Sequence, residues 1–397
     1  MIPQSPVKFS YAALVTSALW APLVSCKEHQ LPGVAARQAS SPSREGMEWA
    51  TKTWRAKGSK KVRNLILTIP DGFGPALEVF ARDFVQWNNT ATGWNCQLGS
   101  DKVQIGSIRT RSTDSYVTDS SASATAYSCA IKTYNGAVGI DKTGILAQRY
   151  SKLQAFASHI YDREAEPTIA EQIVGDQPLG RVADLLLGGG LSMFWPNTTT
   201  GSSRKDGRDL LAKAKKAGFN VFTTRTGFDA LKVESHEEHQ AGIFHYDQAS
   251  RIDHAAHAND PVGHLHEIIM YNEVVDYLRE WVDKNQDTVM IGTAITNAYG
   301  INDANSTEIA VAKANKGNTN FVDTHIGQAM GRRAMIKWGT GGHTAVDVNL
   351  IGYGPNIERM AGNRDNTEVG QFITDQLGLD LPSATNLLNI KRMKNGW

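Results

Sequence analysis

The sequence predicts an α/β protein built on a mostly parallel β-sheet with helices packed against it. Continuous apolar runs such as Asn64–Ile69 (NLILTI) and Thr288–Thr293 (TVMIGT) suit strands that are buried on both faces. Amphipathic stretches with a helical period, Asp209–Gly218 and His264–Lys284, alternate with these runs. This alternation is typical of parallel sheets, and a chain of 397 residues can bury a large core.

Composition narrows the class of binding partner. Apolar residues make up 41% of the chain and charged residues 20%, which is typical of a globular protein. The formal net charge is +1, so the sequence offers no electrostatic basis for binding nucleic acid or a membrane surface. Any anion-binding site must therefore be local.

The N-terminal 26 residues have the pattern of a targeting segment. Lys8 precedes a short apolar run that contains Pro22 and ends near Cys26. This pattern predicts a cleaved signal peptide; an uncleaved signal anchor and lipidation at Cys26 are the alternatives. We therefore expect a secretory-pathway protein that is secreted, vacuolar or membrane-anchored. Membrane attachment requires that the segment stays uncleaved.

The rest of the chain divides into three parts by composition. Residues 27–60 are polar and form a predicted linker, residues 61–385 a folded domain, and residues 386–397 a C-terminal tail. Beyond the N-terminal segment, Cys96 and Cys129 are either paired in a disulfide or two buried thiols. Three N-glycosylation sequons agree with a secretory route, at Asn88, Asn197 and Asn305.

Asp71 lies in a tight glycine-containing turn directly after the first predicted strand. Parallel α/β sheets place ligand chemistry at the carboxyl ends of their strands, so Asp71 is a candidate site residue. A plain Asp-Gly turn is the alternative interpretation.

The segment Val117–Asp141 contains a candidate nucleophile. Asp119 and Ser120 precede a run of small residues, which predicts a helix beginning at Ser120. The unpaired N–H groups and the positive dipole end of that helix would face an anion held at the serine hydroxyl. The alternative is a helix-capping serine without chemistry.

The middle of the chain continues the alternation. Phe156–Ile173 is expected to be helical around a break at Pro167, and its Arg163 could bind two phosphate oxygens. Ala183–Phe194 predicts a buried strand that runs into a glycine turn, and Asn220–Thr224 a short strand.

The segment Ser250–His266 concentrates potential metal ligands. Asp253 and His257 are one helical turn apart and would share a face. An Asp with two His is a plausible zinc set, and His343 follows a glycine turn near the end of the chain. The alternative is a group of buried structural imidazoles, which would include the neighbouring His254, His264 and His266.

In this order, these motifs make residues 60–382 similar to alkaline phosphatases, most closely the fungal type. The most specific stretches are VTDSSASATAYSCAIKTYNGAVGID and SRIDHAAHANDP. The resemblance implies a three-layer sandwich with a mostly parallel central sheet flanked by helices, phosphomonoester substrates, zinc and magnesium cofactors, and a homodimer.

The resemblance also implies a role for each candidate residue. Ser120 would be the nucleophile that forms a phosphoserine, with Asp119 beside it, and Arg163 would hold two phosphate oxygens. Asp71 would bridge a second zinc and the magnesium. The ligands of the first zinc would be Asp253, His257 and His343.

Several positions depart from the family pattern. Ile295 and Thr296 stand where the family has the Asp and His of the second zinc site, and Gln248 aligns with a magnesium-binding Glu. Isoleucine cannot bind a metal, and neutral Thr and Gln are poor substitutes. The family pattern also has segments that are missing here between Asp141 and Phe156 and between Lys232 and Gly242.

The sequence therefore predicts a phosphomonoesterase with one complete zinc site, incomplete second-zinc and magnesium sites, and weakened activity. The first alternative is a catalytically inactive, metal-binding secreted glycoprotein, that is, a pseudoenzyme. The second is an incomplete gene model of an active phosphatase.

Overall fold

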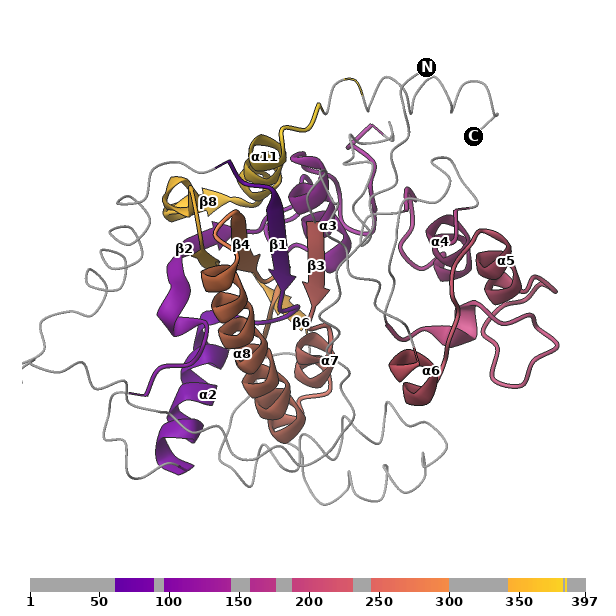
Figure 1. Cartoon of the computed structure of the whole chain (residues 1–397), viewed down its shortest axis with the longest axis horizontal. Coiled ribbons are helices and arrows are strands. Elements are labelled where there is room, and N and C mark those ends of the chain that lie inside the picture. The colour runs from indigo at the N-terminus through magenta and orange to yellow at the C-terminus, as the bar shows by residue number, and fades with distance from the viewer. Residues whose placement is uncertain are drawn as a thin grey trace, which may run out of the picture.

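The computed structural model describes residues 61–88, 96–143, 158–175, 188–230, 244–299, 342–380 and residue 383. Its centre is a six-stranded sheet with the order β3-β1-β4-β7-β2-β8 (Figure 1). β7 is antiparallel to both of its neighbours, and the other three pairings are parallel. The predicted mostly parallel sheet is confirmed. Its strands are β1 (Asn64–Ile69), β2 (Gln104–Arg109), β3 (Phe244–Gln248), β4 (Thr288–Thr293), β7 (Val348–Tyr353) and β8 (Gly362–Asp365).

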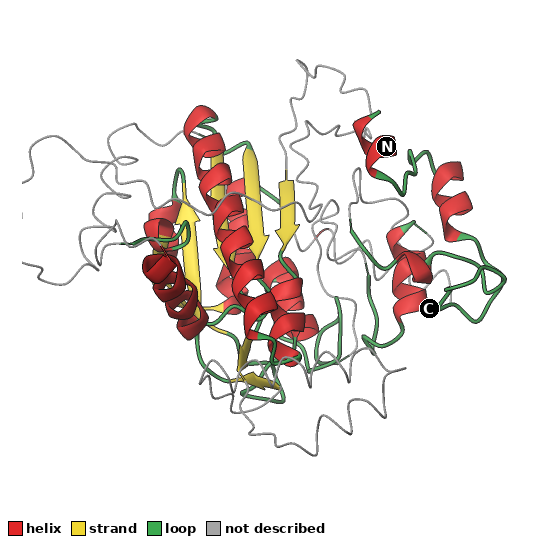
Figure 2. Cartoon of the chain, turned by 90° about the horizontal axis from the view of Figure 1, so that it is seen from below, coloured by secondary structure: helices red, strands yellow, loops and turns green. Residues whose placement is uncertain are grey.

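Helices flank the sheet, as expected for an α/β fold (Figures 1 and 2). α8 packs with α2 and α7 and contacts β4, whereas α3 packs with α11, which contacts β1. The bounds of these helices are α2 (Pro75–Asn88), α3 (Ser120–Cys129), α7 (Arg251–His257), α8 (Pro261–Lys284) and α11 (Asn366–Leu377). Within the described residues, no helix combines the length and apolar character needed to span a membrane.

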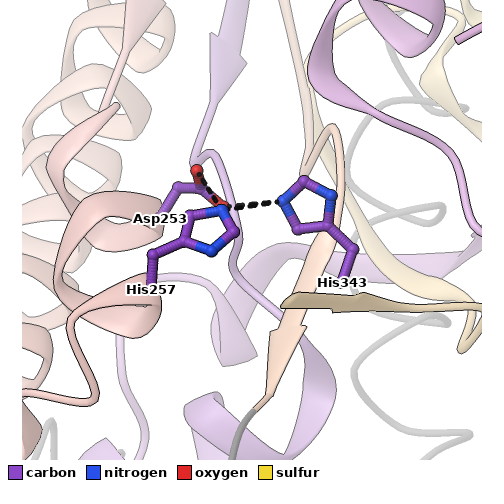
Figure 3. A group of neighbouring side chains, drawn as sticks. All are labelled: Asp253, His257 and His343. Atoms are coloured by element: carbon purple, nitrogen blue, oxygen red, sulfur yellow. Dashed lines mark hydrogen bonds and ion pairs between the residues drawn. The ribbon is translucent and has the colours of Figure 1, made fainter. Parts of the chain in front are cut away.

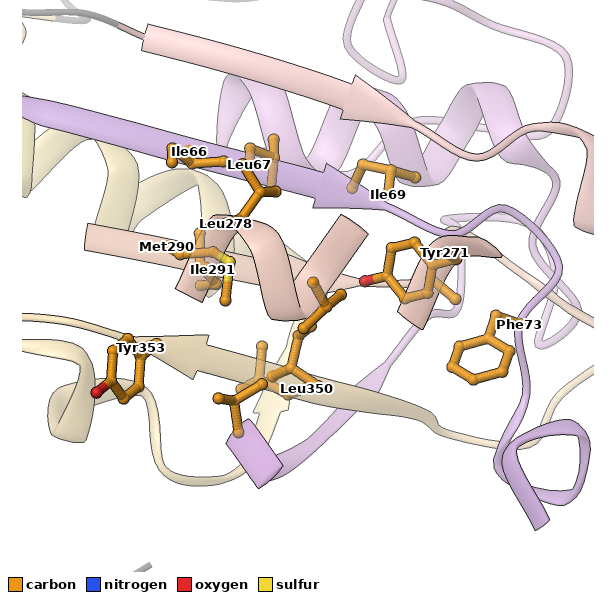
Figure 4. Packing of buried hydrophobic residues seen from close by; sticks show 14 of the residues in the cluster. Ile66, Leu67, Ile69, Phe73, Tyr271, Leu278, Met290, Ile291, Leu350 and Tyr353 are labelled. Carbon is orange, nitrogen blue, oxygen red and sulfur yellow. The ribbon is translucent and has the colours of Figure 1, made fainter. Parts of the chain in front are cut away.

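The central strands are buried on both faces, because successive side chains of a strand point to opposite sides. In β1, Leu65 and Leu67 are fully buried on one face, and Ile66 and Thr68 are buried on the other. All six residues of β4 are buried as well. Figure 4 shows these strands packed against α8 and β7 in the main core. The continuous apolar runs in the sequence reflect this two-sided burial.

A smaller lobe lies beside the β3 edge of the sheet (Figure 1). It has its own core, formed by Ala170, Val174, Leu210 and Ala214. The lobe contains α4 (Glu166–Ile173), α5 (Leu210–Lys216) and α6 (Arg225–Asp229). Elsewhere, β5 (Asn297–Tyr299) pairs with β6 (Gly342–Thr344) in a separate two-stranded sheet. Short 3-10 turns occur at Asp101–Val103, Leu191–Met193 and Ile357–Met360.

Two local predictions were wrong. Pro167 does not break a helix but lies in the first turn of α4, where its missing N–H and fixed φ are compatible with a helix start. Residues 220–223 form a loop rather than a strand. Val221 of this segment packs against the core of the small lobe instead of pairing with a strand.

Other predictions fall partly or wholly outside the described residues. These include the signal segment, the linker, the C-terminal tail, the sequon at Asn305 and most of the strand predicted from Ala183.

The two candidate cysteines do not pair with each other: Cys96 forms a disulfide, whereas Cys129 keeps a buried thiol 3.2 Å from the Ser128 Oγ.

Glu78 of α2 is a buried acid away from the predicted site residues, with an exposed fraction of only 1%. The Ser100 hydroxyl lies 2.5 Å from Glu78 Oε1 and 2.7 Å from Asn272 Oδ1. That hydroxyl has one proton and can donate to only one of them. Burial, followed by the negative charge of Asp101, raises the pKa of Glu78 to about 7. The folded protein therefore favours a protonated Glu78.

This raised pKa predicts a loss of stability as the pH rises. The unfolded chain ionises Glu78 near its ordinary pKa of 4.5, whereas the folded chain retains the proton up to about 7. The free energy of unfolding should fall between these pH values by about 3 kcal/mol. Urea denaturation from pH 4 to 9 should show this fall in the native protein and its loss in Glu78→Gln. The exposed α8 variant Glu280→Gln is the control, and identical profiles for Glu78→Gln and the native protein would contradict the prediction.

Candidate active site

Three adjacent parallel strands, β3, β1 and β4, end at the same edge of the sheet, and a candidate site residue lies at the end of each. Asp71 follows β1 in a turn, Gln248 is the last residue of β3, and Thr296 lies just after β4. The turn at Gly72 has φ +75°, and a Cβ added there would lie 2.7 Å from Asp253 Cα. Glycine therefore allows the β1 turn to pass directly against α7 and brings Asp71 beside Asp253.

Asp253, His257 and His343 form a compact group of potential metal ligands (Figure 3). Asp253 and His257 lie one turn apart on α7, and β6 contributes His343 by pairing with β5 immediately after Thr296. The Nε2 atoms of both histidines lie 3.1 Å apart, and they lie 3.2 and 3.3 Å from the two Asp253 carboxylate oxygens. The structure thus brings together the three predicted ligands of the first zinc.

The donor set and its spacing fit a zinc ion. A tetrahedral zinc with Zn–N distances of about 2.0–2.1 Å separates neighbouring ligand atoms by roughly 3.3 Å. The Nε2–Nε2 separation of 3.1 Å is close to that value. The two imidazoles contact different oxygens of Asp253, at 3.2 and 3.3 Å, and one ligand atom from each of the three residues lies within 4.8 Å of the others. Burial alone would raise the pKa of Asp253, but hydrogen bonds from His257 and His343 outweigh burial and lower the pKa well below its usual range. Asp253 is therefore ionised, as a metal ligand must be.

Ser120 opens α3, as the sequence predicts, but the residue that caps the helix is Asp119. The Asp119 carboxylate accepts hydrogen bonds from the backbone N–H groups of Ala122 at 2.9 Å and Gly136 at 2.8 Å. Because Asp119 performs the capping, the Ser120 hydroxyl points elsewhere and donates to Asp71 Oδ1 at 3.4 Å. The interpretation of Ser120 as a capping residue is therefore wrong.

Arg163 lies next to this helix start. Its Nη1 is 3.3 Å from Asp119 Oδ2, and its backbone N–H donates to Gly136 O at 2.8 Å. The guanidinium lies beside Asp119, and because the side chain is 42% exposed, it remains accessible to a ligand. Asp119 thus connects the predicted nucleophile Ser120, its neighbour in the chain, with Arg163, the predicted phosphate-binding residue.

Asp71 is only 6% exposed and accepts hydrogen bonds from neutral side chains. Thr296 Oγ1 lies 3.3 Å from Asp71 Oδ1, and Gln248 Nε2 lies 3.4 Å from Asp71 Oδ2. Burial, followed by the negative charge of Asp253, raises the pKa of Asp71 to about 6. The sequence predicts Thr296 and Gln248 only as lost ligands, and their contacts with Asp71 were missed. Their positions at strand ends were the available signal.

The remaining histidines of the cluster do not join the metal group. His264 is fully buried on α8, and burial lowers its pKa to about 4. His254 lies 3.1 Å from an Arg251 nitrogen, and His266 is exposed. Ile295 is 2% exposed and belongs to the main hydrophobic core.

Comparison with known proteins gives one consistent family. The model of the family described as alkaline phosphatase matches residues 62–155, 146–249 and 230–379. The breaks between these matches lie where the sequence predicts missing segments. An alkaline phosphatase of Schizosaccharomyces pombe is 31% identical over 453 aligned positions, covering 84% of this chain and 85% of the relative. Because the chain has only 397 residues, segments of that relative have no counterpart here.

A second fungal relative agrees, and two solved structures share the fold. The repressible alkaline phosphatase of Saccharomyces cerevisiae is 28% identical and covers 83% of this chain and 84% of its own length. A cold-active alkaline phosphatase from Shewanella sp. has a TM-score of 0.66 at 20% identity, covering 79% of this chain and 99% of its own. The Thermus thermophilus alkaline phosphatase has a TM-score of 0.61 at 23% identity, covering 89% of this chain and 100% of its own. The fungal resemblance predicted from the motifs is confirmed, and the chain belongs to the alkaline phosphatase family.

Proposed function

We propose that this chain hydrolyses phosphomonoesters through Ser120, with a zinc ion held by Asp253, His257 and His343. The observation that carries the proposal is the convergence of these three ligands beside Asp71, whose carboxylate accepts a hydrogen bond from the Ser120 hydroxyl. Asp71 lies between the two, in contact with Ser120 and next to Asp253. A nucleophile and a metal group at one sheet edge are a common arrangement for group transfer in α/β proteins.

The chain's own residues suggest the order of events. Ser120 Oγ attacks phosphorus, an Oγ–P bond forms, and the ester P–O bond breaks, so that the leaving oxygen departs as an alcohol with the proton given up by the Ser120 hydroxyl. The N-terminus of α3 presents backbone N–H groups to the phosphate oxygens, and Arg163 offers two guanidinium donors. Water then attacks the phosphoserine, which releases phosphate and restores the hydroxyl. A bound divalent cation would stabilise charge on the phosphate oxygens and acidify the attacking water.

We also propose that activity is weak. Apart from the metal group, the side chains that contact Asp71 are all neutral: Ser120, Thr296 and Gln248. These residues do not fit a second zinc or a magnesium ion, which require histidine or carboxylate ligands. Loss of one well-placed electrostatic group commonly lowers the rate about 100- to 1,000-fold.

The test is metal removal and return. Treatment with a chelator followed by dialysis should abolish hydrolysis of an aryl phosphate at alkaline pH, and added zinc should restore it. His343→Ala should remain inactive at the same zinc concentration, because one of three ligands is gone. His266→Ala, which changes an exposed histidine outside the metal group, is the matched control. Turnover that persists without metal, or in His343→Ala, would contradict the proposal.

The competing function is a metal-binding pseudoenzyme, and the observation that favours it is the burial of Ile295 in the core. This function predicts zinc binding that depends on His343 but no turnover above the level of Ser120→Ala. For an incomplete gene model, the transcript would contain coding sequence between residues 141 and 156 and between 232 and 242. Sequencing the transcript distinguishes a gene-model error from real divergence.

We further propose a secretory route for the protein. The sequon at Asn197 lies in an exposed turn that a glycosyltransferase could reach. A mobility shift after enzymatic deglycosylation, lost in Asn197→Gln, would support the route, and unmodified Asn197 in protein from the native host would count against it.

A further inference from the structure

We propose that this active site takes a single divalent cation, and that Thr296 and Gln248 occupy the place of further cations as neutral hydrogen-bond donors to Asp71. Thr296 thereby acts as a positioning residue for Ser120. The proposal depends on the proposed function only for the role of Ser120. The number of bound cations is independent of that role.

Both carboxylate oxygens of Asp71 are occupied by neutral hydrogen-bond donors. Both carboxylate oxygens face side-chain donors: Oδ1 faces Ser120 at 3.4 Å and Thr296 at 3.3 Å, and Oδ2 faces Gln248 at 3.4 Å. A carboxylate that bridges cations must direct these same oxygens at metal ions. No described His, Cys, Asp or Glu forms a second group of three ligands, so the described residues supply only the set centred on Asp253.

Thr296 is the decisive donor. It is fully buried, and its Oγ1 lies 3.3 Å from Asp71 and 3.5 Å from Asp253. Its hydroxyl has one proton, and Asp253 already has His257 and His343 against its two oxygens. The proton is therefore best used at Asp71 Oδ1, the oxygen that also accepts from Ser120. A buried polar side chain needs such a partner, since an unsatisfied one is costly.

Gln248 has its orientation set by Tyr246. The Tyr246 hydroxyl donates to Gln248 Oε1 at 2.8 Å, which leaves the amide N–H₂ to face Asp71. Gln248 is exposed, so water competes for its weaker contact, and Thr296 is expected to contribute more. The distances to Asp71 are long for hydrogen bonds, as is common at catalytic groups without bound substrate.

In this arrangement Asp71 accepts hydrogen bonds from neutral side chains where it would otherwise bind a second cation. Asp71 Oδ1 holds the Ser120 hydroxyl at the start of α3, and Thr296 holds Asp71 Oδ1 from the end of β4. The hydroxyl is oriented by neutral donors around Asp71, and the described residues on this side would not hold a cation that stabilises its ionised form. This arrangement gives a physical reason for slow turnover without loss of the nucleophile.

The first test measures cation stoichiometry in the full chain. Equilibrium dialysis against zinc chloride, followed by metal analysis, should give one tightly bound zinc per chain. Asp71→Asn should leave that number unchanged, whereas His343→Ala should abolish binding. A second tight zinc that disappears in Asp71→Asn would overturn the proposal, even if the chain proves to be an active hydrolase.

The second test measures positioning with a matched pair of variants. Thr296→Val keeps the shape and removes the hydroxyl, and Thr296→Ser keeps the hydroxyl. We expect Thr296→Val to lower kcat about ten- to hundred-fold, with KM and zinc affinity unchanged. Thr296→Ser should recover most of that loss. Equal losses in both variants, or a change in zinc affinity, would contradict the positioning role.

The outcomes separate this inference from the proposed function. One bound zinc without turnover above Ser120→Ala would contradict the proposed hydrolase and leave the single-cation site in place. Turnover with two zinc ions, one of them dependent on Asp71, would support the hydrolase and overturn the inference.

Discussion

Replacing Ser120 with alanine is expected to reduce aryl phosphate hydrolysis to the uncatalysed background. Ser120 contributes the only hydroxyl that both opens α3 and contacts Asp71 among the described residues. Without it, no phosphoserine can form, and the loss should be at least about 1,000-fold relative to the native protein. Initial rates at alkaline pH with added zinc would measure it.

The matched control for this variant is Ser128→Ala. Ser128 lies on the same helix, and its hydroxyl donates within the helix to Thr125 O at 3.3 Å. The same chemical change at this position should leave the rate within a few-fold of the native protein. Zinc binding should be unchanged in both variants, since neither residue belongs to the metal group. Equal rates for native protein and Ser120→Ala would mean that Ser120 is not a nucleophile.

The second large effect is a gain of function. Changing Ile295→Asp together with Thr296→His would restore the carboxylate and the imidazole that the family resemblance implies for a second zinc, with the imidazole at the position that contacts Asp71. If weak activity results from missing charge, the double variant should gain about 100-fold or more in rate. Zinc stoichiometry should rise from one to two ions per chain in the same protein.

The gain should depend on metal, because of where Ile295 lies. Ile295 is 2% exposed within the main core, and a buried unpaired carboxylate there would destabilise the fold by several kcal/mol. We expect the metal-depleted double variant to melt well below the native protein, and zinc to raise its melting temperature more than that of the native protein. The single variant Ile295→Asp is the control, since it lacks the second new ligand. No gain in rate despite two bound zinc ions would contradict missing charge as the cause of weak activity.

The sequence predicts the parts of the site that depend on local structure. The run of small residues after Asp119 predicts the start of α3 at Ser120, because helix capping involves neighbouring residues. The spacing of Asp253 and His257 predicts a shared helix face for the same reason. Two-sided burial of β1 and β4 is visible as continuous apolar runs. Motif order was sufficient to predict the family, which the comparisons confirm.

Elements whose formation depends on distant partners are not determined by the local sequence. Residues 220–223 have the composition of a short strand, but a strand needs a neighbouring strand edge, and Val221 packs against helices instead. The residues around Pro167 suit a helix on either side, and only the packing of α4 in the small lobe determines where that helix begins.

Only the tertiary structure determined what surrounds Asp71. Its contacts with Ser120, Gln248 and Thr296 join residues 49, 177 and 225 positions apart in the chain. The pairing of β5 with β6 brings His343 to α7 in the same way. No local pattern encodes such distances, because they follow from the order in which β3, β1 and β4 lie side by side. The sequence by itself determined which chemical groups are present, and the sheet order determined which of them meet.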